Sequence, residues 1–141
     1  MDQKKKVLFL CTGNSCRSQI AEAIVNDRMA DIWQAVSAGT QPAGYIHPNA
    51  LLVLREIGID HRGFSKSVDD FRDIEFDLVV TVCDDAAETC PMWLGRGKKV
   101  HMGFIDPAKA VGSEEEVLVV FRSVRDQILE KIPQLLRENE S

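Results

Sequence analysis

A cysteine and an arginine stand six positions apart in residues 11–18, which read Cys11, Thr12, Gly13, Asn14, Ser15, Cys16, Arg17 and Ser18. Gly13 and Asn14 are residue types that tolerate the positive backbone φ angle that a tight loop requires. Where such a loop joins a strand to a helix, its backbone N–H groups and the positive end of the helix dipole can hold a tetrahedral oxyanion. The spacing therefore predicts an oxyanion-binding loop over residues 12–18.

Cys11 is the candidate nucleophile of this loop. The N–H donors and the helix dipole favour the thiolate, which is the reactive form of a cysteine. Ser18 is placed to donate a hydrogen bond to that sulfur, and the planar guanidinium of Arg17 can bind two anion oxygens. The competing interpretation is a buried cysteine, a Gly-Asn turn and a surface arginine that share no function.

Two further cysteines, Cys83 and Cys90, are separated by six residues in a short polar segment. Such a pair indicates a thiol relay, in which a loop carries a sulfur outward after oxidation. The pair could instead belong to a zinc site with His101, although zinc sites usually contain more closely spaced cysteine pairs. It could also form a static disulfide or remain as two inert buried thiols. We assign Cys16 no catalytic role.

Both reactive segments follow strong strand patterns. The continuous apolar run Val7–Leu10 is typical of a strand buried on both faces, and it ends at Cys11. Phe76–Val82 is rich in β-branched residues and ends at Cys83. Weaker patterns predict two more strands, over 35–37 and 99–102.

Helical patterns separate these strands, at residues 16–29 and 48–57. Ser113 and Glu116 form a capping-box pattern at the start of a C-terminal helix. An apolar series at helical spacing continues through that helix, and we expect Pro133 to kink it or to end it early.

The alternation of strands and helices predicts an α/β fold: a single three-layer domain over residues 1–141, with a four-stranded parallel sheet flanked by helices. In such sheets, ligands bind beyond the carboxyl ends of the strands. Cys11 and Cys83 both follow such ends, so we expect them to converge on one site.

Composition narrows the classes of partner. The chain has 141 residues and a formal net charge of −5. Because it has no overall positive charge, we do not expect it to bind nucleic acid or an anionic membrane. No apolar run approaches the roughly 20 residues of a membrane span, and residues 1–10 do not fit an export signal. We therefore expect a cytoplasmic protein whose four thiols are in a reducing compartment. A monomer is also expected.

The oxyanion loop, together with Ser37-Ala38-Gly39 and Asp106-Pro107, resembles the low-molecular-weight protein tyrosine phosphatase fold over nearly the whole chain. This resemblance implies that Cys11 attacks the oxyanion, that Arg17 stabilises the transition state and that Asp106 is the general acid. Without the resemblance, an Asp before a Pro more often simply initiates a turn.

The Cys83 and Cys90 segment closely resembles the thioredoxin-coupled arsenate reductases, a branch of the same fold. The resemblance implies that Cys11 attacks arsenate, that Cys83 then attacks Cys11 and releases arsenite, and that Cys90 attacks Cys83. Thioredoxin would reduce the final Cys83–Cys90 disulfide. Some relatives use glutathione and glutaredoxin instead, but the two-thiol relay favours thioredoxin. Phosphate and sulfate are expected to bind in the loop as analogues of arsenate.

Asn14, Glu22 and Ser37 match positions that support the loop in part of this reductase family and help to hold a potassium ion. That subgroup has an Asp ligand where this chain has Lys66-Ser67. The predicted support residues are therefore Asn14, Ser18, Glu22 and Ser37, and no bound cofactor is expected apart from that possible potassium ion. Lys66 could supply the positive charge itself, or it could be a solvated surface lysine.

The sequence is also compatible with two different functions. One is a phosphatase of the same fold that uses only Cys11, Arg17 and Asp106. Such phosphatases usually have aromatic residues just after the Asp-Pro pair, and this chain has Ala108-Lys109-Ala110 there. The second is a non-catalytic oxyanion sensor that signals through thiol oxidation. We treat His47, Trp33 and Trp93 as structural or surface residues.

Overall fold

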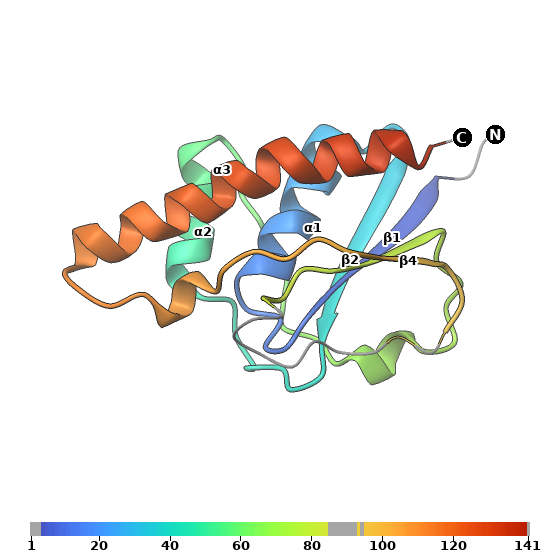
Figure 1. The fold of residues 1–141 in the computed structure, drawn as a ribbon, viewed down its shortest axis with the longest axis horizontal. Helices are drawn as coiled ribbons and strands as arrows, with labels where there is room; N and C mark the ends of the chain where they lie inside the picture. Colours follow the sequence, from blue (N-terminus) through green and yellow to red (C-terminus); the bar gives the residue numbers. More distant parts are fainter. Residues whose placement is uncertain (1–3, 85–92, 94, 141) are drawn as a thin grey trace.

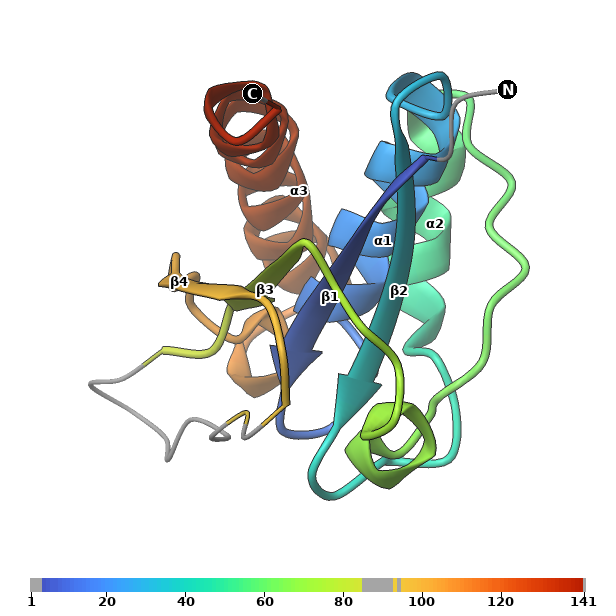
Figure 2. The same cartoon turned by 90° about the vertical axis from the view of Figure 1, so that its right-hand side faces the viewer.

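The computed structural model describes residues 4–84, 93 and 95–140. Four parallel strands form one sheet (Figure 1), and their order, β2-β1-β3-β4, can be followed in Figure 2. The strands are β1 (Lys5–Cys11), β2 (Trp33–Gly39), β3 (Leu78–Thr81) and β4 (Lys98–His101). The helices are α1 (Arg17–Arg28), α2 (Pro48–Glu56) and α3 (Glu114–Glu138), with short 3₁₀ helices η1 (Val68–Phe71) and η2 (Pro107–Lys109). The α/β fold with a four-stranded parallel sheet is confirmed.

Strand β1 lies between β2 and β3, and its residues Val7–Cys11 are all buried. This burial on both faces explains why the sequence is apolar without alternation. Leu10 is in register with Ala38 of β2 and with Thr81 of β3. The carboxyl ends of the three strands therefore meet at one edge of the sheet.

The three α-helices lie on one side of the sheet (Figure 2). Side chains such as Phe9 of β1, Ile24 of α1 and Phe121 of α3 share one buried core there. The opposite face, with Leu8 and Leu10, is covered by η1 and by Phe76 and Trp93. The second covering layer is thus a 3₁₀ helix and its flanking segments.

Helix α3 begins as predicted. Ser113 accepts a hydrogen bond from the Glu116 N–H (3.1 Å), and the Glu116 carboxylate accepts one from the Ser113 N–H (3.2 Å). Of the two outcomes expected at Pro133, the early end is wrong, because α3 continues to Glu138; the kink stays a prediction. Pro133 removes one backbone donor, but Ile132, Pro133 and Leu136 are buried, and this packing holds the last turns in place.

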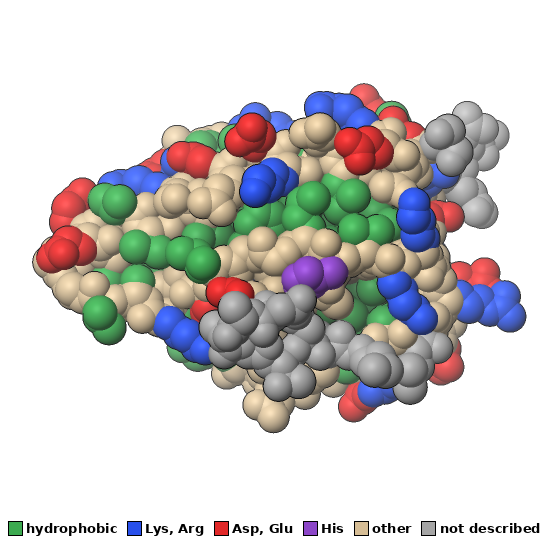
Figure 3. Space-filling view, in the orientation of Figure 1, with side chains coloured by type: hydrophobic (Ala, Val, Ile, Leu, Met, Phe, Trp, Pro, Cys, Tyr) green, Lys and Arg blue, Asp and Glu red, His purple; other side chains and the backbone are tan. Residues whose placement is uncertain are grey.

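The charged surface is mixed in sign. On the face shown in Figure 3, outside the residues drawn in grey, Lys and Arg side chains are interspersed with Asp and Glu. This face therefore presents no extended basic surface of the kind that a nucleic-acid backbone requires. Within the described part of the chain, no helix combines the length and the apolar character needed to cross a membrane.

Loss of the capping box should destabilise α3 measurably. We expect Ser113→Ala to lower the free energy of unfolding by about 1 kcal/mol, because the first turn loses its side-chain acceptor. Urea titration followed by circular dichroism measures this change. Ser123→Ala in the middle of the same helix is the matched control and should not destabilise the protein, since alanine is the better helix former. Equal losses in the two variants would contradict the assignment of the cap.

Candidate active site

The oxyanion loop is held from outside through its carbonyl oxygens. The hydrogen bonds run from Gln41 N to Thr12 O (2.9 Å), from Ala43 N and Ser65 Oγ to Gly13 O (2.9 and 3.2 Å), from Gln19 Nε2 to Asn14 O (3.2 Å), from His47 N to Ser15 O (3.1 Å) and from Ile20 N to Cys16 O (2.9 Å). Every carbonyl from Thr12 to Cys16 thus has a donor that belongs to a neighbouring segment or to α1.

The N–H groups of the same loop behave differently. Among the described residues, the backbone N–H groups of Gly13 to Cys16 donate no hydrogen bond. Asn14 has a φ of 49° and is the one non-glycine residue with positive φ in the described part of the chain. Successive N–H groups in such a turn form an anion-binding concavity, and α1 begins immediately after it. The loop can therefore bind an oxyanion through its backbone.

Asn14 is anchored by its side chain. Its Nδ2 donates to Ser18 Oγ (2.9 Å), and its Oδ1 accepts from Lys66 N (2.7 Å) and from Gln19 Nε2 (2.9 Å). The side chain is fully buried, so each of these bonds forms away from water. These contacts offset the strain of a left-handed conformation in a residue with a Cβ atom.

Cys11 lies at the end of β1 and is buried. Its Sγ atom lies 2.9 Å from Ser18 Oγ. Because Ser18 accepts a hydrogen bond from Asn14, its own hydroxyl proton is available to the sulfur. A donated hydrogen bond stabilises a thiolate, which is the form that a nucleophile requires.

Arg17 connects the loop to the segment that carries Asp106. Its side chain is 4% exposed, and its guanidinium donates to Phe104 O (3.2 Å) and lies 3.7 Å from Asp106 Oδ2. Asp106 also accepts a hydrogen bond from Ala108 N (3.0 Å) as the N-cap of η2. Asp106 therefore initiates a turn and also places a carboxyl group beside the arginine of the loop. Its role in the turn is thus compatible with the role of general acid that the family resemblance implies.

Cys83 follows β3 at the same edge of the sheet. Val82 N donates to Leu10 O (2.9 Å), so the chain leading to Cys83 runs beside the end of β1. Cys83 is fully buried and disulfide-bonded, whereas Cys11 and Cys16 are free thiols. Cys90 lies outside the described residues. The structure thus brings the segments of Cys11 and Cys83 to one edge, as their positions predicted.

Glu22 is the centre of a buried polar cluster behind the loop. Its carboxylate accepts a hydrogen bond from Ser37 Oγ (3.0 Å), lies 3.4 Å from Lys66 Nζ and lies 3.5 Å from His61 Nε2. Lys66 is only 9% exposed, so the interpretation of a solvated surface lysine is wrong: its ammonium is drawn inward by the carboxylate and also donates to Phe64 O (2.7 Å).

This cluster does not fit a potassium ion. Two of the groups proposed to hold one are already engaged with donors: Asn14 Oδ1 accepts from two N–H groups, and the Glu22 carboxylate accepts from Ser37 Oγ and lies 3.4 Å from Lys66 Nζ. Across residues 4–84, 93 and 95–140, no group of three or more His, Cys, Asp or Glu side chains is placed to hold a metal ion. The mechanism therefore contains no step through a potassium ion at this cluster.

Sequence reasoning missed Gln19 and His61. Gln19 Nε2 contacts the loop, and Gln19 Oε1 lies 2.8 Å from His61 Nε2. Neither residue belongs to a motif with a known chemical role. Gln and His side chains are usually exposed, so the sequence pattern does not indicate that this pair is buried beside the loop. Trp93 is buried and donates to Arg96 O (3.0 Å), in agreement with a structural role.

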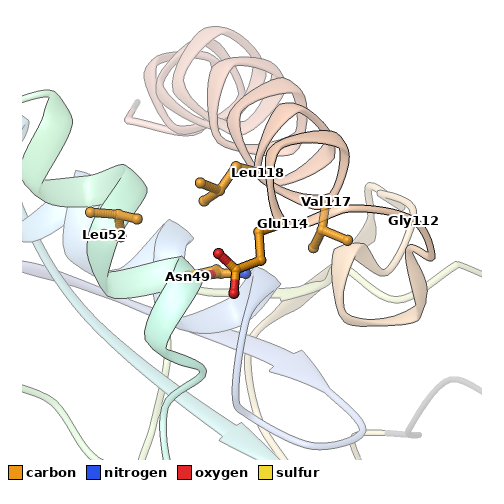
Figure 4. Close-up of a pocket in the computed structure, with 6 residues that line it drawn as sticks. All are labelled: Asn49, Leu52, Gly112, Glu114, Val117 and Leu118. Carbon is orange, nitrogen blue, oxygen red and sulfur yellow. The ribbon is translucent and has the colours of Figure 1, made fainter.

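A pocket of about 380 Å³ lies between α2 and the start of α3 (Figure 4). It is lined by Asn49, Leu52, Gly112, Glu114, Val117 and Leu118. None of the predicted site residues lines it.

Cys16 is the second thiol of the loop and is buried. Burial, with a smaller contribution from the nearby Asp106 carboxylate, raises the pKa of the Cys16 thiol to about 12. Cys16 therefore remains a neutral thiol at neutral pH.

Gly39 should be required for the shape of the loop. A Cβ atom at this position would overlap Thr12 O and lie 3.0 Å from Asn14 N. We expect Gly39→Ala to weaken binding of inorganic phosphate by about tenfold or more, because the displaced backbone no longer directs its N–H groups at the anion. Isothermal titration calorimetry measures this affinity.

Gly58→Ala is the matched control for that variant. Gly58 follows α2, has a φ of +85°, and a Cβ atom there would meet nothing within 4 Å, so alanine strains the backbone at a position whose N–H donates to Arg55 O and not to the loop. It should lower stability by about 1 kcal/mol and leave phosphate affinity unchanged. An equal loss of affinity in both variants would show that backbone strain in general, and not contact with the loop, causes the defect.

The raised pKa of Cys16 predicts a stability change at alkaline pH. Since the folded protein holds this proton up to about pH 12 and the unfolded chain releases it near pH 9.0, the free energy of unfolding should fall as pH rises between these values. Cys16→Ala should reduce that slope, as measured by urea titration from pH 8 to 11. Identical slopes in the parent and the variant would contradict the assignment.

Comparison with known proteins agrees with this geometry. The family model of low molecular weight phosphotyrosine protein phosphatases matches residues 6–140. A protein named arsenate reductase from Bacillus licheniformis is 45% identical over 141 aligned positions, which cover 97% of this chain and 99% of that protein.

Two solved structures are similar to this chain in fold as well as in sequence. An arsenate reductase from Archaeoglobus fulgidus superposes with a TM-score of 0.79 at 30% identity and covers 93% of this chain and 98% of its own. A thioredoxin-dependent arsenate reductase from Corynebacterium glutamicum superposes with a TM-score of 0.68 at 27% identity, covering 96% of this chain and 62% of its own. The chain thus belongs to the low-molecular-weight phosphotyrosine protein phosphatase family.

Proposed function

We propose that this protein is an arsenate reductase that reduces arsenate to arsenite with cysteine thiols. The observation that carries the proposal is the juxtaposition of two features at one sheet edge. The oxyanion loop presents Cys11 with its Sγ 2.9 Å from Ser18 Oγ, and the adjacent strand β3 leads directly to a second redox-capable cysteine, Cys83. A phosphatase requires only the first of these features.

The first step forms a bond between sulfur and arsenic. Arsenate binds to the loop N–H groups and to Arg17, and the Cys11 thiolate attacks the arsenic atom. One hydroxyl group of arsenate leaves as water after Asp106 donates a proton to it. The position of Asp106 near Arg17 supports this role, since both side chains then face the same oxyanion.

The second step transfers two electrons. The Cys83 thiolate attacks the sulfur of Cys11, so that a disulfide forms and the bond between sulfur and arsenic breaks. The electron pair of the broken bond stays on arsenic, which is thereby reduced from the pentavalent to the trivalent state and leaves as arsenite. The two sulfurs are oxidised by the same two electrons.

The third step returns Cys11 to its starting form. Cys90 attacks Cys83, Cys11 leaves as a thiolate, and the dithiol of thioredoxin then reduces the new disulfide. The thioredoxin-dependent relative from Corynebacterium glutamicum supports thioredoxin as the donor. We place this reaction in the cytoplasm, where thioredoxin keeps thiols reduced, and in a monomer.

Phosphate-ester hydrolysis is the second candidate function. The family model and the shared group of Cys11, Arg17 and Asp106 favour it. The segment after Asp106, however, is Ala108-Lys109-Ala110 and offers no aromatic wall for a phenyl ring. We therefore expect hydrolysis of aryl phosphates only as a side activity.

We expect the three cysteine variants to stop the reaction at different steps. Cys11→Ser should form no arsenite. Cys83→Ser should form no arsenite and still hydrolyse an aryl phosphate, because the loop nucleophile is intact. Cys90→Ser should release about one arsenite per protein molecule and then stop, with steady-state turnover at least about a hundredfold below the parent. Arsenite formation coupled to thioredoxin, in single-turnover and multiple-turnover assays, measures all three.

Unchanged steady-state turnover in Cys90→Ser would refute the relay. Full arsenate reduction in Cys83→Ser would refute the second step, and rapid aryl phosphate hydrolysis without arsenite in the parent protein would favour the phosphatase instead.

A further inference from the structure

Gln19 connects the oxyanion loop to a more distant side chain. It lies in the first turn of α1 and is fully buried. Its amide nitrogen faces three acceptors: Asn14 Oδ1 (2.9 Å), Asn14 O (3.2 Å) and Phe64 O (2.8 Å). Rotating the amide by 180° would place its oxygen against these three oxygens, so the orientation of Gln19 is determined by its surroundings.

The other end of the amide contacts His61. Gln19 Oε1 lies 2.8 Å from His61 Nε2, and because Oε1 is an acceptor, that ring nitrogen must carry the proton. The same Nε2 atom lies 3.5 Å from Glu22 Oε2. Among the described residues, His61 is the side-chain donor to Gln19 Oε1, so it fixes the amide that in turn holds Asn14.

We propose that His61 is a positioning residue for oxyanion binding, which acts through Gln19 to hold Asn14 in the left-handed conformation that the anion-binding loop requires. The proposal rests on the oxyanion-binding function proposed above and adds a residue that contacts neither the anion nor the reacting sulfurs. A non-glycine residue keeps a positive φ only when contacts with its neighbours hold its backbone in that conformation. Asn14 is such a residue, and Gln19 supplies two of its contacts.

The charges around His61 do not change its role as a donor. Burial lowers the pKa of His61; the Glu22 carboxylate opposes this shift and the Lys66 ammonium adds to it. The imidazole is therefore neutral at pH 7, and its Nε2–H donates to Gln19 in the neutral and in the protonated form alike. An uncharged donor of similar length should replace it.

The test uses inorganic phosphate as the probe and the full chain as the protein. We expect His61→Leu to raise the dissociation constant for phosphate, and the KM for arsenate, by about tenfold, with kcat changed by less than about threefold. His61→Gln, which retains an N–H donor without a charge, should restore the phosphate affinity to within about threefold of the parent. Gln19→Met tests the same link from the loop side and should resemble His61→Leu.

Asn26→Leu is the matched control. Asn26 also lies on α1, and its side chain exchanges two hydrogen bonds with the backbone of Ala35 (2.9 and 3.0 Å), away from the loop. Its loss should lower the melting temperature without changing phosphate affinity, whereas a general loosening of α1 would change both.

Three results would overturn the proposal: phosphate affinity within about twofold of the parent in both His61→Leu and Gln19→Met, an equal loss in Asn26→Leu, or no recovery in His61→Gln. Failure of the parent protein itself to bind phosphate would instead overturn the proposed oxyanion function, so the two failures are distinguishable.

Discussion

The fixed direction of the peptide groups in residues 12–16 is the constraint on which the site depends. Every carbonyl of this short segment accepts a hydrogen bond from a neighbouring segment or from α1, while the N–H groups of Gly13 to Cys16 bond to no described residue. A peptide group whose oxygen is held on one side must present its N–H on the other. These polar contacts orient the donors that we propose for an anion, and preorganisation of this kind is the main source of electrostatic catalysis in such sites.

The fold explains why these contacts are available. Parallel strands bring the carboxyl ends of β1, β2 and β3 to one edge, so Cys11, Gly39 and the segment leading to Cys83 become neighbours although they are far apart in sequence. The absence of a side chain at Gly39 lets β2 approach the loop closely. Arg17, at the start of α1, reaches the Asp106 segment, so the carboxylate that we propose as the acid is held beside the arginine of the loop.

Much of this could be predicted from sequence, because hydrophobic patterns and local motifs follow from the chain itself. The buried run of β1, the capping box at Ser113 and the loop between Cys11 and Ser18 depend on neighbours in sequence. The rest depends on partners that only the fold brings together. Lysine is a residue type that is usually exposed, and Lys66 is buried because Glu22 attracts it. Helix α3 continues past Pro133 because its last turns pack against the core. Such tertiary effects leave no local pattern.

The N–H groups of the loop, and not a general positive surface, are the groups to which we assign oxyanion binding. Nuclear magnetic resonance of the ¹⁵N-labelled, reduced protein during titration with inorganic phosphate tests this assignment directly. We predict that the amide protons of Gly13 to Cys16 shift downfield together, at one dissociation constant, while amides elsewhere on α2 and β4 do not move. Phosphate binding that left these amide resonances unchanged would contradict it.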